Sequence, residues 1–100
     1  MKILMFGDVV GRVGRLGVKQ AIIKAKAEHQ PDIIIANAEN LAHGTGITPK
    51  VIEEMLAYGV NVFTSGNHVW DKPLGEEILQ AKDPIVIRPF NFGARKSGKG

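Results

Sequence analysis

The sequence predicts an α/β fold, a parallel sheet with flanking helices, and three observations support this. Short apolar runs of strand length alternate with longer segments of helical periodicity along all 100 residues. The run at 32–36 is apolar on both faces, as in a parallel strand that helices cover on each side. Glycine, proline or asparagine stands where one segment gives way to the next. The strand–helix alternation therefore favours one parallel sheet with right-handed crossovers.

The first three elements are a strand at 2–6, a helix from Arg15 to about residue 29 and a strand at 32–36. The first strand ends at a glycine. The helix carries its apolar residues on one face. It must stop before Pro31, because the residue preceding a proline disfavours helical conformations.

The second helix has clear signals at both ends. Thr48 is expected as its N-cap and Pro49 as its first helical residue. Gly59 is a natural stop, since glycine adopts the left-handed conformation that ends many helices. After it we expect a third strand at 60–64. A short helix near 76–81 and a fourth strand at 85–88 complete the pattern.

The composition excludes several classes of protein. Apolar residues make up 44% and charged residues 23% of the chain, as in globular domains and unlike disordered segments. No cysteine is present, which excludes disulfide scaffolds, thiolate zinc sites and cysteine nucleophiles. No stretch approaches the roughly 20 apolar residues of a membrane span. The opening apolar run is too short for a signal peptide. We therefore expect a cytoplasmic protein without a membrane partner.

The net charge of +3 and the pI of 9.4 come mainly from the last residues. Residues 1–87 are close to neutral, whereas the segment from residue 88 onward has no acidic residue. Its basic residues are Arg88, Arg95, Lys96 and Lys99. No basic helix or aromatic–basic interleaving accompanies them, so the pattern disfavours nucleic-acid binding.

Polar side chains follow three of the predicted strands. Asp8 follows the first, Glu39 and Asn40 follow the second, and Asn67 and His68 follow the third. Ligands of open parallel sheets bind outside the carboxyl ends of the strands. Oxygen and imidazole donors without thiolate suit manganese, iron, zinc or magnesium. Carboxylates at two strand ends could hold two ions about 3.5–4 Å apart, as in two-metal phosphoryl hydrolases.

Each of these residues also has a simpler interpretation. Asp8 could cap a helix, Glu39 could be a solvated loop charge, and the asparagines could be turn residues. A histidine in a loop is more often a polar surface residue than a catalyst. The metal hypothesis depends on the coincidence that three separate strand ends carry ligand-type side chains.

Two glycine-rich segments resemble phosphate loops, and neither fits. The segment 7–14 departs from the GxGxxG spacing, and Asp8 would repel a phosphate there. The segment 93–99 matches GxxxxGK, but Gly100 replaces the required serine or threonine.

Five blocks of the sequence, taken together, are specific to one family. They are Gly7–Arg15 (GDVVGRVGR), Asn37–Asn40 (NAEN), Gly44–Thr48 (GTGIT), Gly66–Asp71 (GNHVWD) and Arg88–Asn91 (RPFN). In this order they resemble the signature blocks of the YmdB-type metallophosphoesterases, which belong to the calcineurin-like phosphoesterase superfamily.

The resemblance implies a four-layer α/β sandwich, of which this chain would be half, with two metal ions, iron or manganese. It implies phosphodiesterase activity on cyclic nucleotides such as 2′,3′-cyclic AMP, with a metal-activated hydroxide as nucleophile. Asp8 would bind one metal and Glu39 would bridge both. Asn40 would support the first metal and Asn67 the second. His68 would be the general acid that protonates the leaving oxygen.

Two departures from the pattern matter. Val10 stands where the wider superfamily has a histidine ligand, a feature that the YmdB type shares. The family's second half also supplies three histidine ligands that have no counterpart here. We therefore expect residues 1–100 to be the N-terminal part of a single metallophosphoesterase domain, inactive alone. The alternative is a non-catalytic or degenerate α/β domain that binds nucleotides or nucleic acid. The sequence does not determine the native metal, the physiological substrate or the oligomeric state. A homo-oligomer is one of the alternatives.

Overall fold

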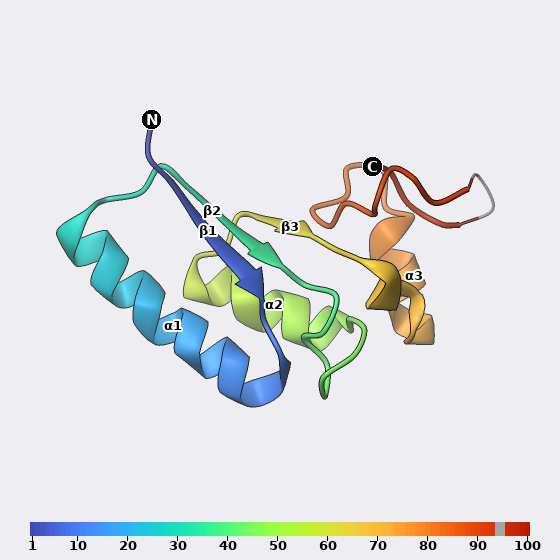
Figure 1. The fold of residues 1–100 in the computed structure, drawn as a ribbon, viewed down its shortest axis with the longest axis horizontal. Helices are drawn as coiled ribbons and strands as arrows, with labels where there is room; N and C mark the ends of the chain where they lie inside the picture. Colours follow the sequence, from blue (N-terminus) through green and yellow to red (C-terminus); the bar gives the residue numbers. More distant parts are fainter. Residues whose placement is uncertain (94–95) are drawn as a thin grey trace.

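A three-stranded parallel sheet organises the chain. The computed structural model describes residues 1–93 and 96–100. The strands are β1 (Ile3–Asp8), β2 (Ile33–Asn37) and β3 (Val62–Thr64), in the order β1–β2–β3. Both pairings are parallel, and β2 is the central strand (Figure 1). The predicted parallel α/β fold is confirmed.

The two long helices lie side by side on one face of this sheet (Figure 1). They are α1 (Gly11–Glu28), which connects β1 to β2, and α2 (Pro49–Tyr58), which connects β2 to β3. Two right-handed crossovers that advance in the same direction place both helices on the same side. Ile34, Ala36 and Phe63 point to this side and are buried in the core.

The opposite face of the sheet is apolar and largely open. Ile3 and Met5 are 55% and 65% exposed, and Ile33 and Ile35 are half-buried beside them. The sequence predicts helices on both faces of the sheet, but α1 and α2 cover only one. The run at 32–36 is therefore apolar on a face that these two helices leave free.

Helix α1 begins four residues earlier than the sequence predicts, at Gly11. Gly11 has φ +59°, a backbone conformation that L side chains rarely adopt, and glycine reaches it without strain. Gly14, inside the first turn, lies against Val9, whose Cγ1 atom would be 3.1 Å from a Cβ at position 14. Both glycines are therefore part of α1, whereas the sequence predicts a helix that begins after them, at Arg15.

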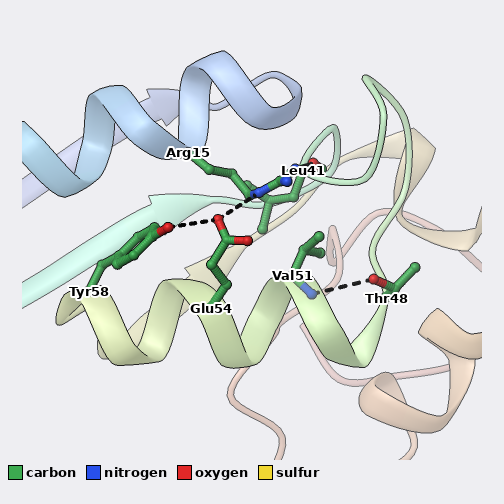
Figure 2. Close-up of polar contacts among 6 residues, drawn as sticks. All are labelled: Arg15, Leu41, Thr48, Val51, Glu54 and Tyr58. Atoms are coloured by element: carbon green, nitrogen blue, oxygen red, sulfur yellow. Dashed lines mark hydrogen bonds and ion pairs between the residues drawn. The ribbon is translucent and has the colours of Figure 1, made fainter.

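Helix α2 has both predicted ends. The Thr48 hydroxyl accepts a hydrogen bond from the backbone N–H of Val51 (3.4 Å), and Pro49 is the first helical residue (Figure 2). Gly59 has φ +114°, in the left-handed region. The prediction for this helix is confirmed.

The predicted fourth strand is wrong in this structure. Within the described residues, Val86 forms only a single parallel bridge with Phe63. The backbone N–H of Arg88 bonds to the carbonyl of Lys99, away from the sheet, and the next residue is a proline. Because β3 is short and proline has no N–H to donate, the pairing does not extend.

Two short helices follow β3. A 3₁₀ turn, η1 (Asn67–Trp70), forms where the sequence predicts a loop. Helix α3 (Pro73–Leu79) begins at a proline, three residues before the predicted start. Within residues 1–93 and 96–100, no helix is long and apolar enough to cross a membrane.

Candidate metal centre

The carboxyl ends of the three strands lie level at one edge of the sheet. Asp8 pairs with Asn37, and Asn37 pairs with Thr64. The register shifts between Phe6 and Asp8, so that Gly7 is an extra residue in β1. Such bulges redirect the side chains next to them. Here the bulge brings the carboxylate of Asp8 level with the end of the central strand.

Asp8 and Asn40 are in direct contact. The side-chain amide nitrogen of Asn40 donates to both carboxylate oxygens of Asp8, at 2.9 and 3.1 Å. The backbone carbonyl of Asn40 accepts a bond from the N–H of Gly11, at 3.0 Å. Two of the predicted ligands are therefore adjacent, although 32 residues separate them along the chain.

Glu39 connects the end of β2 to the end of β3. Its carboxylate lies directly against Gly66, where any Cβ would overlap both of its oxygens. The same carboxylate accepts a hydrogen bond from the backbone N–H of His68, at 3.2 Å. Behind it, the backbone N–H of Glu39 bonds to the side-chain oxygen of Asn37 (3.3 Å). A half-buried carboxylate thus lies among backbone groups at the centre of the edge.

Asn67 and His68 begin the η1 turn, directly after β3 and Gly66. Asn67 is exposed. The Nδ1 atom of His68 lies 2.8 Å from an Oδ atom of Asp71, and both side chains are about 40% exposed. The structure brings His68 to the same edge as Glu39, which its backbone contacts.

Asp71 has no role in the site predicted from the sequence. Its signal is the spacing: in a helical turn, residues three apart face each other, and Asp71 is the third residue after His68. The carboxylate fixes which nitrogen of the imidazole faces away, which makes Asp71 part of the candidate site.

The donors present fit part of a metal centre. Asp8, Glu39, Asn40 and Asn67 supply carboxylate and amide oxygens, the ligands that hard divalent cations prefer. Among residues 1–93 and 96–100, however, no three His, Cys, Asp or Glu side chains gather as a metal-binding cluster. Four oxygen-donor side chains do not complete two coordination spheres, so the set fits a dinuclear centre only together with further ligands.

The comparison with curated proteins gives a clear relative. The chain is 43% identical, over 102 aligned positions, to a protein of Bacillus subtilis (strain 168) named 2′,3′-cyclic-nucleotide 2′-phosphodiesterase. The match covers the whole of this chain and only 38% of that protein. The chain therefore spans less than half the length of this relative.

Two solved structures share the fold, each superposing with a TM-score of 0.88. One is a hypothetical protein from Thermus thermophilus, 31% identical, of which this chain covers 38%. The other, from Mycoplasma pneumoniae, is described as a novel phosphatase; it is 36% identical, and this chain covers 37% of it.

The family model of the YmdB-like proteins matches residues 4–100, nearly the whole chain. These are also the residues that carry the five blocks and the strand-end site described above. This chain belongs to the YmdB-like protein family.

Proposed function

We propose that this chain is the N-terminal part of a metal-dependent phosphodiesterase that hydrolyses cyclic nucleotides such as 2′,3′-cyclic AMP. The observation that supports this most is that two hydrogen-bonded pairs, Asp8 with Asn40 and Glu39 with the backbone of His68, lie at one edge of the sheet. The name of the Bacillus subtilis relative supports the substrate class. The complete protein is called the intact enzyme below.

Two metal ions, iron or manganese, would be held partly by this chain. Asp8 and Asn40 would bind the first ion, Asn67 the second, and Glu39 would bridge them. We propose that the missing ligands come from residues beyond these 100, since the relatives are longer. The bound ions would supply activated water and positive charge opposite the phosphodiester.

His68 would act as the general acid. Its Nδ1 atom is engaged by Asp71, so the Nε2 atom is the one free to donate a proton to the leaving oxygen. The contact between its backbone and Glu39 keeps this imidazole at the metal edge. The substrate class that this arrangement suits is a small phosphodiester, and we propose a cytoplasmic location for the enzyme.

The alternative of a nucleic-acid-binding domain depends on the basic tail, and the described tail residues weigh against it. Arg88 donates to the carbonyls of Pro89, Phe92 and Gly98. Lys96 lies 5.0 Å from the centre of the Trp70 ring, and Lys99 bonds to the carbonyl of Lys82. These cations stabilise the fold of the tail itself. Arg95 lies outside the described residues.

The test uses the intact enzyme with manganese and 2′,3′-cyclic AMP. We expect His68→Ala to lose at least about 100-fold in turnover, the lower range for general acid catalysis, while its metal content stays at the wild-type level. His29→Ala is the matched control, since His29 is exposed at the end of α1, next to the opposite sheet edge. We expect it to be fully active.

Glu39→Ala should lose both metal ions, measured by inductively coupled plasma mass spectrometry. An intact enzyme that does not hydrolyse phosphodiesters would contradict the proposal. Loss of metal from His68→Ala would make His68 a ligand and not the acid.

A further inference from the structure

Arg15 belongs to the GDVVGRVGR block, and nothing in the proposed chemistry uses it. It lies in the second turn of α1, outside the set of candidate ligands, and its side chain is only 13% exposed. A largely but not fully buried guanidinium keeps its charge and needs partners for the donors that water does not reach. The identity of those partners indicates what the residue does.

Arg15 has two partners in two different elements. Its Nε atom donates to the Glu54 carboxylate of α2, at 2.9 Å. Its Nη1 atom donates to the backbone carbonyl of Leu41. Figure 2 shows the Arg15 side chain reaching from α1 to both, and the Tyr58 hydroxyl donating to the same Glu54 oxygen, Oε2, at 3.1 Å.

Leu41 directly follows the two candidate ligands Glu39 and Asn40. The Leu41 side chain is fully buried in the core, and its backbone carbonyl is held by Arg15. The loop is therefore fixed by both packing and a hydrogen bond. Gly11, one turn before Arg15 on the same face of α1, donates its N–H to the carbonyl of Asn40 (3.0 Å). Helix α1 therefore holds two consecutive carbonyls of the loop that carries the site.

We propose that Arg15 is a positioning residue: through the Leu41 carbonyl it fixes the loop that presents Glu39 and Asn40 to metal. The inference rests on the proposed function. Groups that orient metal ligands from behind typically contribute 10-fold to 100-fold in metal affinity. The Nε atom pairs with Glu54, whereas the separate Nη1 bond to the Leu41 carbonyl is the contact that reaches the loop.

The experiment separates positioning from general stability. It compares variants of the intact enzyme that lose the Leu41 contact of Arg15 with variants that lose only the contacts around Glu54. Arg15→Met removes both contacts. Glu54→Gln removes the ion pair and Tyr58→Phe removes the outer hydrogen bond, and both leave the Leu41 contact in place. We expect all three to lower the melting temperature. Only Arg15→Met should weaken Mn²⁺ binding, by about 10-fold or more, and raise the backbone amide exchange rates of residues 40–42.

Arg15→Lys keeps the charge but has one nitrogen where arginine uses two, so we expect intermediate Mn²⁺ affinity. It also replaces Arg15→Met should that variant not fold. Equal loss of Mn²⁺ affinity in Arg15→Met and Glu54→Gln would overturn the inference, as would wild-type amide exchange in the arginine variants. If the wild-type enzyme binds no Mn²⁺ while exchange at 40–42 still rises in Arg15→Met alone, the proposed function fails and the positioning role stands.

Discussion

The Glu39 carboxylate lies against the backbone of Gly66, close enough that residue 66 can carry no side chain. The next contact in the same segment is the N–H of His68, which donates to this carboxylate at 3.2 Å. One acidic side chain thus joins the ends of two strands through main-chain contacts. The position of Glu39 therefore depends on the absence of a Cβ at position 66.

Gly66→Ala should displace Glu39 and weaken metal binding in the intact enzyme by about 10-fold to 100-fold. The reason is steric overlap with both carboxylate oxygens. Mn²⁺ titration followed by electron paramagnetic resonance measures this. Combining Gly66→Ala with Glu39→Asp, whose carboxylate is one methylene shorter, should cost less than the sum of the two single changes. Strict additivity of the two losses would mean that the residues are independent. Gly93→Ala is the control, since a Cβ there meets open space.

Thr48→Ala should lower the free energy of unfolding by about 1 kcal/mol, the usual cost of losing a helix N-cap. The hydroxyl of Thr48 is the acceptor for the backbone N–H of Val51 at the start of α2. Thr48→Ser keeps this acceptor and should stay close to wild type. Urea unfolding of the three proteins at equal concentration gives the comparison. Equal stability of the alanine and serine variants would show that the cap does not stabilise α2.

Deprotonation of Tyr58 should lower the stability of the folded state at alkaline pH. Burial raises the pKa of the Tyr58 hydroxyl above its usual value, and the hydrogen bond to the Glu54 carboxylate adds to this. The folded state therefore keeps the phenol proton more tightly than the unfolded state. This contribution to stability is fully present below pH 10 and is lost as the pH rises through the raised pKa.

Unfolding series from pH 8 to pH 12, flanking the usual tyrosine pKa of about 10, should show wild type losing stability more steeply than Tyr58→Phe. The two proteins share all other titrating groups, so the difference between the curves isolates Tyr58. Parallel curves would contradict the prediction.

Expressed alone, the 100-residue chain should self-associate through the open face of its sheet. Ile3 and Met5 expose apolar side chains in register with Ile33 and Ile35, which form a continuous apolar surface. Met5→Lys should reduce the association seen by sedimentation velocity. Val13→Lys is a matched control, because Val13 is 85% exposed but lies on α1, away from this face. An equal effect of both lysines would show that the sheet face is not the contact.

The sequence predicts best those features that depend on neighbouring residues. The cap at Thr48 and the stop at Gly59 need only local backbone chemistry, and both are where the pattern places them. The strand-end positions of Asp8, Glu39 and His68 follow from parallel topology alone. Their roles as ligands and acid are still predictions.

Features that depend on distant partners are harder to predict. The predicted fourth strand does not form, since the backbone N–H of Arg88 bonds to the carbonyl of Lys99. No local sequence pattern signals this contact. Arg15 resembles an ordinary helix-surface cation until the fold brings Glu54 and Leu41 to it. The start of α1 depends on the left-handed Gly11, whose N–H bonds to the Asn40 carbonyl across the loop.

The contacts at the sheet edge also set an order of assembly. The Asn40–Asp8 bonds join residues 32 positions apart and need only β1, α1 and β2 in place. The His68–Glu39 bond joins residues 29 positions apart and also needs β3. Each closes one strand–helix–strand unit, and domains begin to fold from the N-terminus during synthesis. A released chain truncated before residue 66 contains the groups for the first half of the edge but not for the second. The position of Glu39 is therefore complete only when the second unit has formed, because its contact with the His68 backbone needs β3 in place.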